Sequence, residues 1–478
     1  MEGLLEQVVD LALTMGADYA EARFQSDITE TVILKNGVPD ATTLSEARGL
    51  GVRVLFKGAL GFASTNLLNR RAFKNAVKRA LKGAKAASRA VSLGVRMGEA
   101  DLGKGRVEVK PRISFDYVDM DARLELLSEA DRRAVEAAKE AGADLPARIF
   151  TLDTLTTEKT IITSDGARVS SSIPRVALSA FMTAYHPQKG AVQRFFDRGE
   201  AAGWETVERW DIVRLAREEA YSLAKVLMEA EKPPKGVVDM ILGPEVIGLV
   251  SHESSGHPGE ADRVLGREAA QAGETYLKAD SLGMRVGSQL VNVVDDPTIK
   301  GSFGFYLYDD EGVKARKRVL IKEGVINEFL QNRETASVFG VESNGASRAN
   351  AYNREPIVRM ANTFLEPGDY TFEELVEDVR EGIYIKNFME WNIDDRRFNQ
   401  RYVGLEAYKI EDGELKGLVR NPVLEVTTVG LWSAVDAVGK DLEFQAAYCG
   451  KSDPMQGMPV WTGGPHTRLR GIRLGGGT

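Results

Sequence analysis

The sequence has little of the two residue types that most often hold metals or form cross-links, with one cysteine and four histidines among 478 residues. A lone cysteine, Cys449, can form no disulfide within the chain, which favours a reducing compartment. Long apolar runs are also lacking, since Val246–Val250 is far shorter than the roughly 20 residues of a membrane-spanning helix. The chain starts with an acidic segment that breaks at Gly16, unlike a secretory signal. We therefore expect a cytoplasmic protein with no membrane partner.

An excess of positive charge is lacking as well. Lys and Arg number 62 against 70 Asp and Glu, which gives a formal net charge of −8. Sequence-independent DNA binding depends on many phosphate contacts, so this acidic balance argues against a nucleic-acid partner. The basic stretch at 69–89 is interpreted as the solvated face of a helix. Glycine and proline are scattered without a short period, which excludes collagen-like and solenoid chains.

Helical and strand patterns alternate in the first half of the chain. Helices are expected at the N-terminus before Gly16 and at 69–90, 121–141 and 212–229. The dipeptide Asn36-Gly37 is typical of a tight hairpin turn. Between the helices the pattern predicts separate strands at 147–156, 158–163, 168–172 and 176–183.

The second half is rich in strands. Two prolines within 231–236 mark a linker, and hairpin signals follow at 319–326 and 407–415. We expect an α+β protein, in which an N-terminal sheet-and-helix domain precedes a strand-rich, metal-binding C-terminal domain. The predicted subdomain boundaries are 1–110, 111–232 and 233–478.

Two of the four histidines fall in one short segment, His252-Glu253-Ser254-Ser255-Gly256-His257. The segment follows an apolar helix that begins at Pro244, so the pair lies at the far end of that helix. Histidines four apart face the same side of a helix, but five apart they are about 140° apart. Either a π-bulge lies within the segment or the helix ends first. We expect the second, with Gly256 as a left-handed cap and Pro258 displacing His257 from the helical region.

Two histidines are too few for a catalytic zinc, which usually has three protein ligands and a water. Candidates for the third ligand are Glu260, Asp262 and the distant Cys449, whose alternative role is that of a small buried hydrophobic residue. Two His, one Cys and a water form a known catalytic set. Glu253 is suited to accept a proton from a zinc-activated water, as a general base that does not bind the metal.

The motifs resemble those of the TldD/PmbA (TldD/TldE) family of metalloproteases, and of its TldD branch in particular. The matching segments span most of the chain in order: Gly16-Ala17-Asp18-Tyr19, the Asn36-Gly37 hairpin, 49–53, 251–257, 309–312, 356–363, Cys449-Gly450-Lys451 and the glycine-rich end at 475–477. The His-Glu-x-x-x-His segment is the specific one, because the TldE/PmbA partners resemble the fold but lack it.

The resemblance implies zinc (Zn2+) held by His252, His257 and Cys449, with Glu253 as general base. It also implies a homodimer, or a heterodimer with a metal-free TldE/PmbA-like paralogue. The implied substrates are unfolded or short peptides bound in extended form, and strand addition would make their recognition largely backbone-based.

The leading hypothesis is a zinc-dependent metallopeptidase. The alternatives are a non-catalytic peptide-binding or modulator subunit with a structural metal, and a metal hydrolase acting on non-peptide amides. Arg348 and Arg359 are interpreted either as a clamp for a peptide carboxylate or as members of surface salt bridges. His186 and His466 are interpreted as solvated or structural residues.

Overall fold

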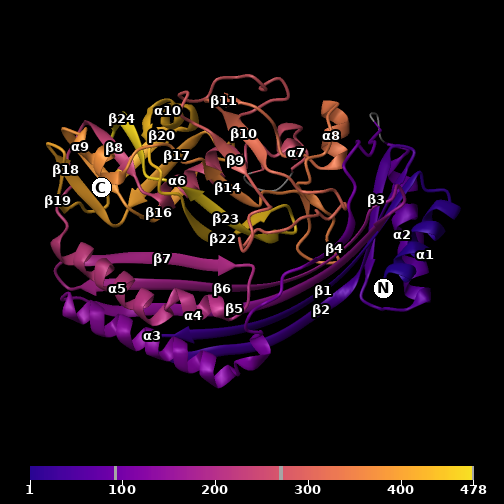
Figure 1. The fold of residues 1–478 in the computed structure, drawn as a ribbon, viewed down its shortest axis with the longest axis horizontal. Helices are drawn as coiled ribbons and strands as arrows, with labels where there is room; N and C mark the ends of the chain where they lie inside the picture. The colour runs from indigo at the N-terminus through magenta and orange to yellow at the C-terminus, as the bar shows by residue number, and fades with distance from the viewer. Residues whose placement is uncertain (91–93, 269–272, 476–478) are drawn as a thin grey trace.

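A long curved sheet of seven strands, formed by residues 19–200, is the base of the molecule (Figure 1). The computed structural model describes residues 1–90, 94–268 and 273–475, so Gly476 and Gly477 of the glycine-rich end lie outside the described residues. The strand order is β3-β2-β1-β5-β6-β4, and β7 pairs with a second segment of β6. The strands are β1 Tyr19–Lys35, β2 Val38–Phe56, β3 Ala59–Thr65, β4 Lys104–Glu108, β5 Asp144–Thr163, β6 Arg168–His186 and β7 Gly190–Glu200.

The predicted hairpin at Asn36-Gly37 is confirmed. Both residues have positive φ angles, 52° and 78°, which the tight turn between β1 and β2 requires. The predicted breaks within β5 and β6 are wrong, because each strand pairs along its whole length with its neighbours. Pro174 falls between the segments of β6 that pair with β4 and with β7, so its missing N–H removes no bond to either strand.

Helices cover two regions of this sheet. Near β3, α1 (Glu2–Thr14) and the amphipathic α2 (Arg70–Ala87) pack on β1 and β2, and the basic side chains of α2 are exposed. Farther along, α3 (Met120–Glu140) and α5 (Ile212–Glu229) pack against β5 and β6, with α4 (Glu205–Trp210) beside them. The C-terminal part lies on the opposite side of the sheet from α3 and α5 (Figure 1). One sheet thus includes strands from both predicted N-terminal subdomains.

The C-terminal part contains two six-stranded sheets, ordered β11-β10-β9-β14-β23-β22 and β19-β18-β15-β8-β24-β21. Smaller sheets are β16-β17-β20 and β12-β13. The strands are β8 Val237–Leu242, β9 Val293–Asp295, β10 Arg318–Lys322, β11 Val325–Ile326, β12 Ser347–Arg348, β13 Ile357–Val358, β14 Asn362–Leu365, β15 Glu381–Ile385, β16 Phe388–Ile393, β17 Asn399–Gly404, β18 Ala407–Glu411, β19 Glu414–Leu418, β20 Val423–Thr427, β21 Val435–Val438, β22 Glu443–Lys451, β23 Gln456–Gly464 and β24 Thr467–Arg473.

The helices of this part are short, and most of them follow runs of several strands rather than alternate with single strands. They are α6 Pro244–Ser251, α7 Ala261–Val264, α8 Arg333–Phe339, α9 Phe372–Glu377 and α10 Thr428–Ser433. Mostly antiparallel sheets with segregated helices confirm the predicted α+β class. No helix in the described parts of the chain is both long enough and apolar enough to cross a membrane.

A buried ion-pair group joins the two parts of the molecule. Arg53 of β2 donates to Glu21 of β1 at 2.9 Å and to Glu311 of the C-terminal part at 2.5 Å. All three side chains are almost completely buried. Because removing one member of a buried ionic group leaves an uncompensated charge, this group fixes the C-terminal part on the sheet.

Candidate metal centre

The position of α6 is set by close packing on β23. Val246, Ile247 and Val250 share one hydrophobic core with β8, β9 and β24. At Gly248 an added Cβ atom would lie 2.8 Å from the backbone nitrogen of Gly463, so only glycine allows this approach. The C-terminal end of α6 therefore lies against the hairpin of β22 and β23.

The histidine segment continues α6 as a single π-helical turn, His252–Gly256. The backbone N–H of His257 donates to the carbonyl of His252, five residues earlier, at 3.0 Å. The expectation of a left-handed cap at Gly256, with His257 displaced from the helical region, is wrong: Gly256 has no positive φ angle, and His257 has helical angles of φ −58° and ψ −45°. Because the π turn contains one extra residue, His257 follows His252 on the same side of the helix.

The tertiary structure brings His252, His257 and Cys449 together. One ligand atom from each lies within 4.8 Å of the others, and all three residues are buried. The imidazole rings are 4.8 Å apart at an angle of 80°, and Sγ of Cys449 lies 3.4 Å from Nε2 of His257. Cys449 lies on β22, opposite Met458 of β23.

Glu260 and Asp262, the other candidates for the third ligand, interact with protein side chains. Oε2 of Glu260 lies 3.0 Å from Nδ1 of His257 and 2.7 Å from Nε of Arg263. Asp262 accepts from the ammonium group of Lys451 at 2.7 Å. A carboxylate on Nδ1 orients the ring and leaves Nε2 for a metal, as is usual for metal-binding histidines.

The protonation states of the three donors suit a metal. Burial lowers the pKa of His252 and of His257, which favours the neutral, ligating imidazole. Burial alone would raise the pKa of Cys449, but His257 and the Arg359 guanidinium outweigh it and lower that pKa to about 7. A thiolate is the form of cysteine that binds zinc.

Glu253 is held beside these donors by an ion pair. The carboxylate accepts a hydrogen bond from Arg397, and both side chains are less than one-tenth exposed. Arg397 lies in the turn between β16 and β17, where it has a left-handed φ of 61°. Asp394 closes this turn by accepting from the N–H of Phe398 at 2.8 Å. The turn therefore positions the cation that fixes Glu253.

The two histidines, Glu253 and Cys449 line a cavity of about 310 Å³. Its walls come from β7, α6, β16 and β22, including Asp197, Phe388, Trp391 and Tyr448. Nδ1 of His252 is buried and has no hydrogen-bond partner among the described residues. An unpartnered ring nitrogen, a low-pKa thiol and an oriented second imidazole fit a metal such as zinc.

Several features of the site gave no sequence signal. Nothing in the pattern around Arg397 or Asp197 indicated a position near the histidines, because both approach through tertiary packing. The expectation of surface salt bridges for Arg348 and Arg359 is wrong, since both are buried and donate to backbone carbonyls. His466 is hydrogen-bonded on both ring nitrogens, to Asp441 and to the hydroxyl of Tyr384, as expected for a structural residue.

Comparison with known proteins covers nearly the whole chain. Family models match residues 20–84 (PmbA/TldA metallopeptidase domain 1), 113–226 (PmbA/TldA metallopeptidase central domain) and 235–476 (PmbA/TldA metallopeptidase C-terminal domain). A metalloprotease of Methanocaldococcus jannaschii is 32% identical over 447 residues, which cover 94% of this chain and 95% of the relative. A zinc metalloprotease TldD homolog of Saccharolobus solfataricus is 30% identical over 250 residues, 52% of this chain and 54% of the relative.

A solved structure shows the same fold. TldE from Thermococcus kodakarensis superposes with a TM-score of 0.74 over 99% of this chain and 100% of that protein. The sequence identity is 18%, so this likeness concerns the fold alone.

Proposed function

Because this chain belongs to the PmbA/TldA metallopeptidase family, we propose that it is a zinc-dependent peptidase that hydrolyses short or unfolded peptides. The observation that carries the proposal is the meeting of His252, His257 and Cys449 in one cavity, with Glu253 adjacent in sequence and facing the same space. Two imidazoles and one thiolate are a donor set that would hold a catalytic zinc and keep it accessible to water or substrate.

The three donors would hold the metal, and the other groups would act around it. Zinc bound there supplies Lewis-acid chemistry, lowering the pKa of water and polarising a carbonyl group. Glu260 keeps the His257 ring in one orientation through Nδ1. The imidazoles, the thiol and the Glu253 carboxylate are themselves buried, which strengthens the electrostatic interactions among them.

Glu253 is the proposed general base. Its carboxylate accepts a proton from the attacking water and then returns it to the nitrogen of the departing amine. Arg397 holds this carboxylate in place, so that little reorganisation is needed at the moment of reaction.

Peptide binding is proposed along β22. This strand is the last of its sheet in the described chain, so one edge presents backbone N–H and C=O groups without a neighbouring strand. Residues 445–450 of β22 line the metal cavity opposite β16. An extended peptide added to this edge would be recognised through its backbone, with little selection for its sequence.

The proposed assembly is a dimer in the cytoplasm, formed either by two copies or with a metal-free TldE/PmbA-like paralogue. The fold shared with TldE supports a complex of two similar chains. Light scattering of the protein alone, and after co-expression with such a paralogue, tests the two forms. A monomer under both conditions would contradict the proposed assembly.

The catalytic proposal is tested by Glu253→Gln, which keeps the shape of the side chain and removes the base. We expect about one zinc per chain to be retained and the turnover of an unfolded peptide to fall by about 10²–10⁴-fold. Glu229→Gln, at the exposed end of α5, is the matched control and should cleave normally. Unchanged cleavage by Glu253→Gln would remove Glu253 from the mechanism.

Removal of the metal distinguishes this proposal from the alternative hypothesis, a non-catalytic modulator subunit whose metal is structural. A mild chelator should abolish cleavage while circular dichroism and the unfolding midpoint stay close to those of the untreated protein. Unfolding on removal of zinc would indicate a structural metal.

A further inference from the structure

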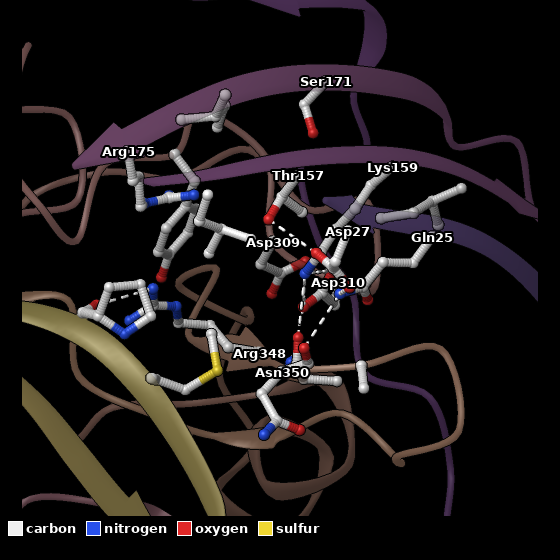
Figure 2. Close-up of a pocket in the computed structure, with 18 of the residues that line it drawn as sticks. Gln25, Asp27, Thr157, Lys159, Ser171, Arg175, Asp309, Asp310, Arg348 and Asn350 are labelled. Carbon is white, nitrogen blue, oxygen red and sulfur yellow. Dashed lines mark hydrogen bonds and ion pairs between the residues drawn. The ribbon is translucent and has the colours of Figure 1, made fainter. Parts of the chain in front are cut away.

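A second cavity of about 310 Å³ lies between the long sheet and the C-terminal part (Figure 2). β1, β5 and β6 form one wall, and segments around β12 and the start of β23 form the other. Part of the lining is apolar, including Leu155, Ile161, Ile173 and Met458. Tyr448 lines this cavity and the metal cavity alike, so the two spaces lie on either side of the residue next to Cys449.

The carboxylates of this second cavity already have partners. Asp310 accepts from the ammonium group of Lys159 with both oxygens, each at 2.8 Å. Asp309 accepts from three backbone N–H groups at 2.9 to 3.0 Å. Asp27 accepts from the hydroxyl of Thr157 at 2.8 Å and from a neighbouring glutamine amide. The negative charges of these three carboxylates are therefore stabilised by groups other than the two arginines of the cavity.

Two buried guanidinium groups lack an acidic partner. Arg175 and Arg348 are 7% and 4% exposed, and neither has a carboxylate within 4 Å in the parts of the chain that the structure describes. Arg175 donates Nε and Nη2 to the carbonyls of Phe303 and Phe305 at 2.9 Å. Arg348 likewise donates to two backbone carbonyls, at 2.6 and 3.0 Å. Nη1 of Arg175 makes no hydrogen bond with any described residue.

The two cations lie on the same side of the cavity in Figure 2, away from the Lys159–Asp310 pair. Burial lowers the pKa of Arg175 to about 10, and the nearby charge of Arg348 contributes to this shift. Both groups remain charged at neutral pH, and a buried charge without a counter-charge is unfavourable. An entering anion would relieve this cost, and a carboxylate suits the planar N–H fork of arginine.

We propose that this cavity binds the C-terminal carboxylate of the peptide substrate through Arg175 and Arg348. The inference rests on the proposed peptidase function and specifies its mode: the chain would remove short fragments from free C-termini. An extended peptide on β22 advances about 3.3 Å per residue, so a few residues past Tyr448 suffice to enter the cavity. The apolar lining then accommodates the side chain of the last residue.

The test compares one unfolded peptide as a free acid and as a C-terminal amide, by kcat/KM and by equilibrium binding to the zinc-loaded Glu253→Gln variant. We expect the free acid to be favoured about tenfold or more in both measurements, since hydrogen bonds to charged groups are the strong ones. Arg175→Gln should reduce the acid-to-amide ratio to about one and leave the amide almost unaffected. Arg175→Lys should restore part of the ratio, because it keeps the charge.

Matched variants distinguish a carboxylate site from a general effect of charge or of folding. Arg106→Gln, at an exposed arginine of β4 in the same sheet, should keep the wild-type ratio. If Arg175→Gln does not fold, Ser171→Phe is the alternative variant, because it narrows the cavity and keeps both arginines. It should also reduce the acid-to-amide ratio to about one. A glutamate placed near the end of the amide peptide distinguishes a side-chain carboxylate from the terminal one, and tight binding of that amide would overturn the terminal assignment.

The outcomes for the two proposals are distinct. The wild-type protein could bind the acid and the amide equally well, or Arg175→Gln could weaken the binding of both peptides to the same extent. Either result would show that the arginines only stabilise the fold and bind no peptide carboxylate. Preferential binding of the acid without any cleavage would keep the carboxylate site and overturn the peptidase.

Discussion

Sγ of Cys449 lies 3.4 Å from Nε2 of His257, although the two residues are 192 positions apart in the chain. The contact exists because β22 pairs with β23 and the end of α6 packs against both strands. A thiol and an imidazole at this distance, with a second imidazole ring 4.8 Å from the first, form a group that could hold one metal ion.

Cys449→Ala tests the third ligand. The variant keeps a small apolar side chain, so we expect a folded protein that binds zinc more than about 100-fold more weakly, because even the loss of a group behind the ligands typically costs 10–100-fold. Zinc content by mass spectrometry after dialysis, with competition by a chromogenic chelator, gives the result. Undiminished zinc affinity would show that another group completes the site.

Arg397→Met tests the positioning of Glu253. Methionine fills most of the volume but releases the carboxylate, and we expect kcat to fall about 10- to 100-fold with zinc content and KM little changed. Arg401→Met, at a half-exposed arginine in the same hairpin, is the control. Partial recovery in Arg397→Lys would support an electrostatic role, and wild-type kcat in Arg397→Met would contradict it.

Gly256→Ala tests the packing of the π turn. An added Cβ would lie 1.9 Å from Sδ of Met360, which is fully buried, so one of the two residues must move. We expect the free energy of unfolding to fall by about 1–3 kcal/mol and zinc affinity to decrease with it. The double variant with Met360→Ala should lose less than the sum of the single variants. Simple additivity in chemical denaturation would argue against this contact.

Asp197→Asn tests a pH effect in the metal cavity. Burial raises the pKa of Asp197 to about 6, so the folded protein holds this proton more tightly than the unfolded chain does. The resulting stabilisation is present below about pH 4 and is lost as the pH rises to about 6, an effect of about 2–3 kcal/mol. The variant should lack this decline when unfolding is measured from pH 4 to 7. The exposed Asp144→Asn should retain it, and identical pH profiles for wild type and Asp197→Asn would contradict the assignment.

Several elements of the fold could be predicted from local features of the sequence. The Asn36-Gly37 turn and α5 were predicted to within a residue, because turn chemistry and helical periodicity are local properties. The breaks in β5 and β6 were predicted wrongly, since continuous pairing with neighbouring strands overrides local interruptions such as Pro174. The left-handed cap predicted at Gly256 was also wrong: Gly256 has no positive φ angle, and the reason for a glycine there is its close approach to Met360, which the sequence does not reveal.

The amino-acid sequence alone specifies which chemistry is available: two histidines five apart, an adjacent glutamate and one thiol in the whole chain. Folding settles which of these groups meet. It places Cys449 at Nε2 of His257, and it pairs Glu260 with Nδ1 of the same ring and Asp262 with Lys451. It also brings Arg397 to Glu253, and Arg175 and Arg348 to one cavity. The reason is physical: the types of potential ligand residue and their short-range spacing can be read from the sequence, whereas contacts between distant residues arise from strand register and core packing.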